Sequence, residues 1–188
     1  MAKVKLAPAV EAIHGHVGNM LFRRCNGQEV VGKVPDRTNV VPTADQLAQQ
    51  EKFKLAAFYG KTVMADAAKK AVYTTAAEGR GIQAFALAVA DFLNPPAIDQ
   101  VDLSKYTGKV GDTITVRASD EVEISGMTVG VRDEGGTVLE SGAAVKGAGG
   151  MTWTYTATTA LDVGASVVIE VSATDLPGNV TTKVQPKT

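Results

Sequence analysis

The chain has 188 residues, of which 45% are hydrophobic and 21% charged, and its 19 Lys and Arg against 20 Asp and Glu give a net charge of −1. This composition is typical of a globular protein and excludes a disordered or collagen-like chain. The near-neutral charge argues against binding to nucleic acid or to an acidic membrane surface, because both select an excess of basic residues.

The first residues carry Lys3 and Lys5 but reach Pro8 and Glu11 before an apolar stretch of secretion-signal length can form, so we expect no signal peptide. No segment is apolar for long enough to predict a membrane span. The single Cys25 excludes an intramolecular disulfide. We favour an extracellular or cell-surface location, and a cytoplasmic one stays open.

The N-terminal residues 2–17 alternate apolar with other side chains, and no partner strand for them is evident in the sequence. We therefore interpret this segment as an arm that adds to the sheet edge of a neighbouring copy. The apolar residues expected to make that contact are Val4, Leu6, Val10 and Ile13.

Asn26-Gly27 lies between two apolar runs and predicts a β-hairpin with strands at 18–24 and 28–34. An isolated hairpin is marginal in water, so it must pack on the following helices or pair with another chain. Three basic side chains could give it a charged face, which we interpret as solvated or as facing an acidic surface: Arg23, Arg24 and Lys33.

Thr43 and Gln46 form a capping-box pattern that starts a helix running to about residue 59. We expect Gly60 to break or kink it, because glycine is a poor helix former. A second helix is predicted over 62–77 and a third over 82–93.

Composition changes at Pro95-Pro96. Ala supplies 14 of the 52 residues from 43 to 94, whereas Val and Thr supply 14 each from 95 to 188. Charge changes as well, from 12 basic and 8 acidic residues before Pro95 (net +4) to 7 basic and 12 acidic after it (net −5). We predict two domains, a hairpin and helical domain at 1–94 and a β domain at 95–188.

The second half alternates short β-branched runs with turns, which fits an antiparallel sandwich. Trp153 and Tyr155 alternate as core residues do. The strands are expected at 101–106, 112–119, 124–133, 137–145, 151–158, 166–174 and 180–185.

The segment Val167-Val-Ile-Glu-Val-Ser-Ala-Thr-Asp-Leu-Pro-Gly-Asn-Val-Thr resembles the last strand pair of bacterial Ig-like domains, and Gly111-Asp-Thr-Ile-Thr-Val resembles their early strand. The resemblance covers about residues 97–186. It implies an immunoglobulin-like fold without a single function, since such modules serve as spacers, adhesins and virion decorations. The predicted fold class is thus an α+β N-terminal region, with a hairpin and about three helices, followed by an all-β immunoglobulin-like sandwich.

The first half is similar to an uncharacterised group of bacterial proteins. The resemblance rests on Gly15-His-Val-Gly18, on Asn26-Gly27, on the link Val34-Pro35 and on a helix that reads Gln-Leu-Ala-Gln-Gln-x-Lys-Phe from Gln46 to Phe53. It supports an architecture and no particular activity.

Candidate sites are few. His14 and His16 would share one face of an extended strand and could bind a metal, but two ligands are too few, so an ordinary polar segment is favoured. Cys25 lacks the neighbours that would activate a nucleophile. We expect no cofactor and no enzymatic activity.

Oxygen-bearing side chains gather in two loops of the second half. Such loops can bind calcium, yet they lack a dense run of alternating acids, so solvated loop ends are favoured. The residues are Asp120, Glu121 and Glu123 in one loop, and Asp175 and Asn179 in the other.

The opposite charges of the two halves favour heterologous contacts between copies, which close into rings or run into filaments. We therefore expect a non-enzymatic structural subunit that assembles head-to-tail, as an extracellular filament or a virion-like particle. The expected interface combines the apolar arm, the three basic hairpin residues and the acidic loop 120–123. The alternative is a binding module whose sandwich recognises carbohydrate or protein.

Overall fold

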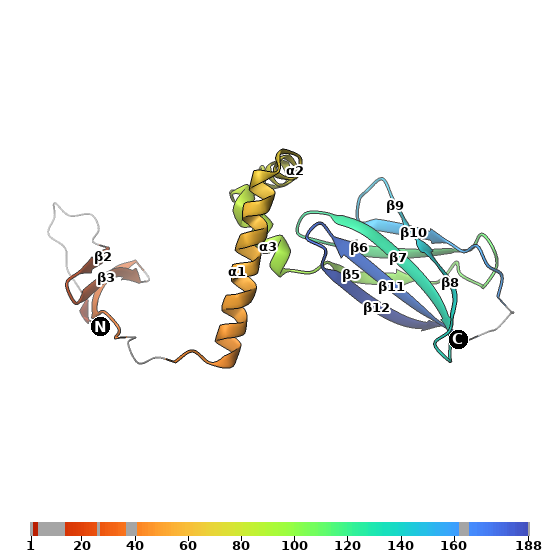
Figure 1. The fold of residues 1–188 in the computed structure, drawn as a ribbon, viewed down its shortest axis with the longest axis horizontal. Coiled ribbons are helices and arrows are strands. Elements are labelled where there is room, and N and C mark those ends of the chain that lie inside the picture. Colours follow the sequence, from red (N-terminus) through yellow and green to blue (C-terminus); the bar gives the residue numbers. More distant parts are fainter. Residues whose placement is uncertain (1, 4–13, 26, 37–40, 162–165, 188) are drawn as a thin grey trace. The chain divides into compact units, whose positions relative to one another are not determined.

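A computed structural model describes residues 2–3, 14–25, 27–36, 41–161 and 166–187 (Figure 1). The contacts divide the chain into two compact units, residues 1–46 and 47–188. The composition change at Pro95 therefore falls inside the second unit, and the separation into domains at 1–94 and 95–188 stays a prediction.

The first unit contains a four-stranded antiparallel sheet with the strand order β1-β4-β3-β2. Strands β3 and β4 form the predicted hairpin, with Cys25 opposite Gln28. The strands are β1 (Ala2–Lys3), β2 (Gly15–Val17), β3 (Met20–Cys25) and β4 (Gln28–Lys33).

The prediction that residues 2–17 have no partner strand in the chain is wrong at both described ends. Ala2 pairs with Val31, and Gly15 pairs with Phe22. The hairpin has two open edges whose N–H and C=O groups need partners, and these short strands supply them. Val4, Leu6, Val10 and Ile13 lie outside the described residues.

Within residues 14–25, 27–36 and 41–46 of the first unit, no residue is buried. The apolar side chains of Phe22 and Val31 are half-buried, and those of Val17 and Met20 are 66% and 51% exposed. The described part of this sheet therefore lacks a core of its own.

Three helices precede the sandwich: α1 (Ala44–Ala65), α2 (Ala67–Ala77) and α3 (Ala84–Leu93). The first three residues of α1 belong to the first unit and the rest to the second. The predicted capping box of α1 is confirmed, since the Thr43 N–H donates to Oε1 of Gln46 (3.0 Å) and the Gln46 N–H donates to Oγ1 of Thr43 (3.3 Å). These bonds satisfy two of the amides that a helix N-terminus leaves without partners.

The predicted break at Gly60 is wrong, because α1 continues to Ala65. A Cβ atom at Gly60 would lie 2.9 Å from Cε2 of Phe85 and 3.1 Å from Cγ2 of Val89. Glycine is needed here for the close approach of α3, and the packing gained outweighs its low helix propensity.

The helix ends instead at Asp66, whose Oδ1 accepts the N–H groups of Ala68 and Lys69 and so caps α2. The helices share a small apolar cluster, and Val122 of the second half packs against it. The buried members of this cluster are Val63, Tyr73, Ala77, Leu87 and Ala88.

The rest of the second unit is a β-sandwich of two antiparallel four-stranded sheets, with the strand orders β5-β6-β10-β9 and β12-β11-β7-β8 (Figure 1). The strands are β5 (Ala97–Asp102), β6 (Thr113–Ser119), β7 (Ile124–Asp133), β8 (Val138–Ala143), β9 (Val145–Lys146), β10 (Thr152–Thr156), β11 (Val167–Asp175) and β12 (Val180–Lys187).

The expected first strand at 101–106 is wrong, because β5 begins directly after Pro96 and ends at Asp102. Oδ1 of Asp102 accepts the Ser104 N–H, and the Tyr106 N–H donates to the Leu103 carbonyl, so the chain turns there. The other expected strands are present within a few residues, and Trp153 and Tyr155 are buried in the core as predicted.

Both edges where the sheets meet carry a feature that hinders further strand pairing. The chain passes from β8 to β9 through the buried Ala144. On the other side Nζ of Lys183 in β12 donates to the carbonyls of Ile98 and Asp99 in β5, at 3.0 and 2.9 Å. A charged side chain that covers an edge hinders pairing with another chain.

Replacing Gly60 by Leu should force α3 away from α1 and lower the free energy of unfolding by about 1–3 kcal/mol, since extra atoms do not fit a tight contact. Denaturant unfolding measures this. The exposed Ala48→Leu on the same helix is the control and should leave stability close to that of the wild type. Equal stability of the two variants would contradict the close contact.

Candidate functional site

The most connected polar site is the turn between β11 and β12. Oδ1 of Asp175 accepts the N–H groups of Gly178 (2.8 Å) and Asn179 (2.6 Å), and its Oδ2 accepts Nδ2 of Asn179 (2.7 Å). Gly178 has φ +96°, a conformation that favours glycine. Nδ2 of Asn179 also donates to the carbonyls of Asp91 (3.4 Å) and Phe92 (3.2 Å) in α3. The turn therefore joins the helices to the sandwich.

Asp91 lies beside this turn and is fully buried. Its Oδ2 accepts the hydroxyl of Tyr73 at 2.5 Å, and that hydroxyl lies 2.9 Å from the hydroxyl of Tyr59. Burial raises the pKa of Asp91 to about 7, although the hydrogen bond from Tyr73 lowers it. The charges of Asp120 and Asp175 and the proximity of the Asp120 carboxyl group raise this pKa further. Burial and the hydrogen bond to Asp91 also raise the pKa of Tyr73.

Asp120 approaches the same place from the loop between β6 and β7. Both its carboxylate oxygens are shielded from solvent and make no hydrogen bond within the described part of the chain. Burial raises the pKa of Asp120, the nearby backbone amides of residues 121–123 lower it, and the charge of Asp175 raises it. Three carboxylates from separate segments thus meet at the junction.

The other two acids of this loop also have partners within the chain. Oε1 of Glu121 accepts Nδ2 of Asn94 (3.2 Å), and its backbone carbonyl accepts Nη1 of Arg80 (2.9 Å). Oε1 of Glu123 forms an ion pair with Nζ of Lys146 (2.7 Å). The predicted acidic surface is therefore occupied largely by contacts inside the chain, and its role in assembly stays a prediction.

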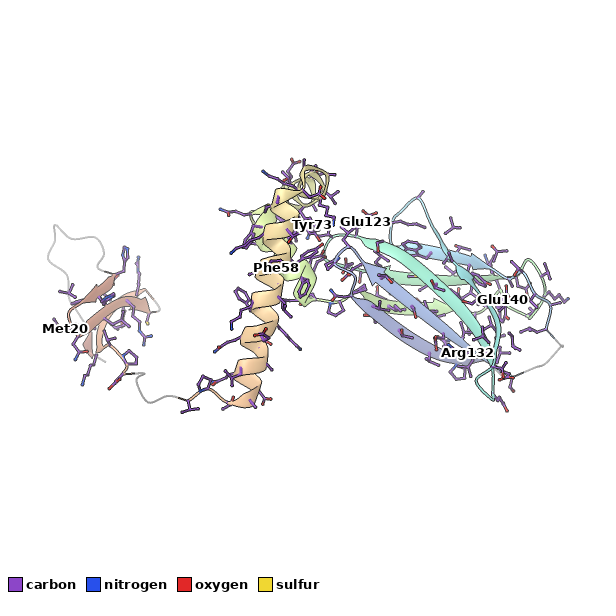
Figure 2. All side chains as sticks on the ribbon, in the orientation of Figure 1. Met20, Phe58, Tyr73, Glu123, Arg132 and Glu140 are labelled. Atoms are coloured by element: carbon purple, nitrogen blue, oxygen red, sulfur yellow. The ribbon has the colours of Figure 1, made fainter. Side chains whose placement is uncertain are left out.

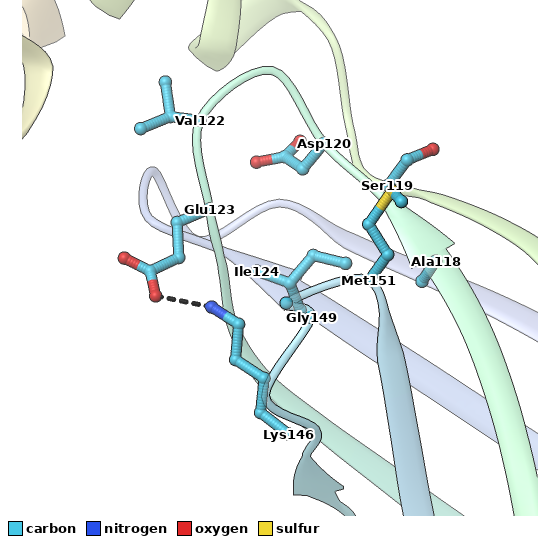
Figure 3. A pocket seen from close by; sticks show the side chains of 10 residues that line it. Ala118, Ser119, Asp120, Val122, Glu123, Ile124, Lys146, Gly149 and Met151 are labelled. Carbon is cyan, nitrogen blue, oxygen red and sulfur yellow. Dashed lines mark hydrogen bonds and ion pairs between the residues drawn. The ribbon is translucent and has the colours of Figure 1, made fainter. Parts of the chain in front are cut away.

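A pocket of about 250 Å³ lies between this loop and the connection from β9 to β10 (Figure 3). Asp120, Glu123 and Lys146 surround it together with Gly149 and Met151. The Glu123–Lys146 ion pair spans one side, as the dashed line in Figure 3 shows. Ser119 also lines the pocket, and its hydroxyl donates to Oδ2 of Asp99 (3.4 Å).

The remaining candidate residues predicted from the sequence belong to the first unit. His14, His16 and Cys25 are exposed. Nε of Arg24 lies 3.8 Å from Oε1 of Glu29. Arg23 lies on β3, and Lys33 lies on β4. Over the ranges that the structure describes, no three His, Cys, Asp or Glu side chains group as a metal site.

A second buried acid, Glu140 of β8, was not singled out from the sequence. Its Oε1 accepts the hydroxyl of Tyr155 and both the N–H and the hydroxyl of Thr158. Burial raises its pKa, but these hydrogen bonds outweigh burial and hold the pKa below its ordinary value. The sequence signal that could have identified Glu140 is an acid at an inward-facing position of a strand, because a buried acid needs polar partners.

No protein-family model matches the chain, and no curated protein matches it. Among solved structures it is similar to CopC from Methylosinus trichosporium OB3b, with 17% identity over 48% of this chain and 89% of that one, at a TM-score of 0.37. An engineered protein matches with 20% identity and a TM-score of 0.36, and the match covers 50% of this chain and 19% of that one.

A tetra-tandem repeat from the extending region of a large adhesion protein matches with 18% identity and a TM-score of 0.33, over 49% of this chain and 22% of that chain. None of these similarities bears on the function of this protein. In the segments that the structure describes, no helix is both long and apolar enough to cross a membrane.

Asn179→Asp should weaken the junction, because the amide donor that reaches two carbonyls of α3 becomes an acceptor. We expect a loss of about 1–3 kcal/mol in the free energy of unfolding, measured with denaturant. Asn19→Asp makes the same chemical change at an exposed position and should have little effect. An Asn179→Asp protein with the same free energy of unfolding as the wild type would show that this side chain does not hold the helices.

Glu140→Gln should lower stability by about 1–3 kcal/mol near neutral pH, because a charged acceptor of three hydrogen bonds is lost. A depressed pKa stabilises the fold above the unfolded pKa, so the difference from wild type should shrink as pH falls below about 4. The exposed Glu134→Gln serves as control. A difference that is constant with pH would contradict this role.

Proposed function

We propose that this chain is a non-enzymatic structural subunit whose copies associate through the sheet of the first unit and the outer side of α1. The observation that carries the proposal is a shortage of burial. No residue at 14–25, 27–36 or 41–46 is buried, and neither is any residue of α1 from Ala44 to Leu55. Sheets and helices of this kind are stable when an apolar face is covered.

The outer side of α1 carries an apolar stripe, defined as Leu47, Leu55 and Phe58. These side chains are 52%, 52% and 72% exposed, and Figure 2 labels Phe58 on the helix. At 3.6 residues per turn they fall on one side of α1, and the buried Ala56, Gly60 and Val63 fall on the opposite side. The contacts with α3 therefore leave the stripe uncovered.

The sheet of the first unit offers a matching surface. Strand pairing places Val17 opposite Met20 and Phe22 opposite Val31, so these four side chains share one face. A second copy is the proposed occupant, with the stripe of one copy lying on the sheet of the next. Burying each Leu or Phe fully is worth about 1.5–3 kcal/mol, which favours association.

Stripe and sheet face are different surfaces, so their contact is heterologous and continues from copy to copy as a ring or a filament. The edges of the sandwich support this arrangement, because Lys183 and the β8–β9 connection hinder strand pairing there. In this proposal the sandwich is immunoglobulin-like, since its strand orders match two sheets of the ABED and GFC type with one added strand.

The alternative, a carbohydrate-binding module, needs exposed aromatic side chains near one end of the sandwich. All three aromatic residues after Pro95 are instead buried: Tyr106, Trp153 and Tyr155 are 1%, 5% and 3% exposed. A sugar platform would therefore need other side chains, and this favours the structural role.

The double variant Leu55→Glu/Phe58→Glu should abolish association, because two carboxylates would have to be buried against the sheet. Light scattering and electron microscopy measure this, with the wild type expected to form particles or filaments well above the 19.5 kDa of one chain. The control Gln49→Glu/Gln50→Glu adds the same charge away from the stripe and should still associate.

Because the proposed contact is apolar, association should persist at about 0.5 M salt, where charge interactions are largely screened. A wild-type protein that remains monomeric at high concentration would contradict the proposed function. So would equal association by the stripe variant and its control.

A further inference from the structure

The junction between the helices and the sandwich concentrates negative groups that form no ion pair within the described residues. Asp91 and Asp175 are 0% and 2% exposed, and the oxygens of Asp120 are shielded as well. No ion pair in the described residues includes any of the three. Isolated buried carboxylates are costly, so a cluster of this kind needs either donors or protons.

The three acids differ in how their oxygens are satisfied. Asp175 accepts two backbone amides and the Asn179 side chain, which suits a carboxylate. Asp91 has one donor, Tyr73, on Oδ2 and none on Oδ1. Asp120 has none on either oxygen. A single proton between Asp91 and Asp120 would satisfy an oxygen of each and remove one of the two charges.

The groups that face Asp91 come from every element around it. Tyr59 of α1 and Tyr73 of α2 are hydroxyl groups whose pKa is raised, mainly by burial, so they stay uncharged. Asp120 and Asp175 are acids from the sandwich. Two basic groups contact the loop, and other acids engage both: Arg80 binds Glu121, and Lys146 forms an ion pair with Glu123. No cation of the described residues therefore replaces the proton.

We propose that Asp91 and Asp120 share one proton and that its loss at rising pH loosens the helices from the sandwich. The junction is then a pH-sensitive contact, firm at acidic pH and weaker at alkaline pH. When the proton leaves, three carboxylates face one another across α3, the β6–β7 loop and the β11–β12 turn. Repulsion between them acts against the Asn179 hydrogen bonds that hold α3.

The sign follows from proton linkage. An acid whose pKa is higher in the folded state binds its proton more tightly there, so the stabilisation is complete below the unfolded pKa of about 4 and is lost as pH rises to about 7. Across that range the equilibrium constant for opening of the junction should rise by up to about tenfold per pH unit. This inference is independent of the proposed self-association.

Hydrogen exchange of the full chain between about pH 5 and pH 8, corrected for the intrinsic pH dependence of exchange, measures the opening. We expect the opening constant of the α2 and α3 amides to rise with pH, while that of the core strands β7 and β11 stays nearly constant. Asp91→Asn keeps the shape, supplies a donor to Asp120 and should remove the pH dependence.

The control Glu78→Gln removes one exposed acid near the end of α2 and should keep the wild-type pH dependence. A pH-independent wild type, or an Asp91→Asn protein that opens with the same pH dependence as wild type, would overturn the inference. If Asp91→Asn does not fold, the infrared band of a protonated carboxyl group in the wild type decides. Its presence at about pH 5 and loss by about pH 8 support the shared proton, and its absence at about pH 5 refutes it.

Discussion

The side-chain amide of Asn179 holds together two parts of the chain that are 87 residues apart. The last carbonyls of a helix have no partners inside the helix, and this amide supplies a donor to two of them while its other hydrogen bond fixes Asp175. Because α3 is held at the sandwich and packs on Gly60, it covers the side of α1 that lies opposite the stripe.

The same junction places carboxylates where burial makes charge expensive. A buried acid is tolerated when several donors bind it, and Oε1 of Glu140 accepts three hydrogen bonds from Tyr155 and Thr158. Asp91 and Asp120 lack such donors, so protonation is the remaining way to lower the cost. Two buried acids in one domain therefore respond to pH in opposite directions, and the difference lies in their hydrogen bonds.

Local patterns in the sequence predicted local structure well. The Asn-Gly hairpin, the Thr43–Gln46 capping box and the alternating core residues of the sandwich all depend on neighbouring residues, and all are present. The break expected at Gly60 was wrong because its reason lies 25 residues away, in Phe85. The junction could not be predicted for the same reason. Asp91, Asp120 and Asp175 lie far apart in the sequence, and only the fold brings them together.

The central claim, that the stripe of one copy lies on the sheet of another, can be tested by photo-crosslinking from position 58 in a mixture of isotopically light and heavy chains. The account predicts crosslinks from this position to β3 or β4 that join a light chain to a heavy one. Crosslinks confined to chains of one isotope, or none to these strands, would contradict it.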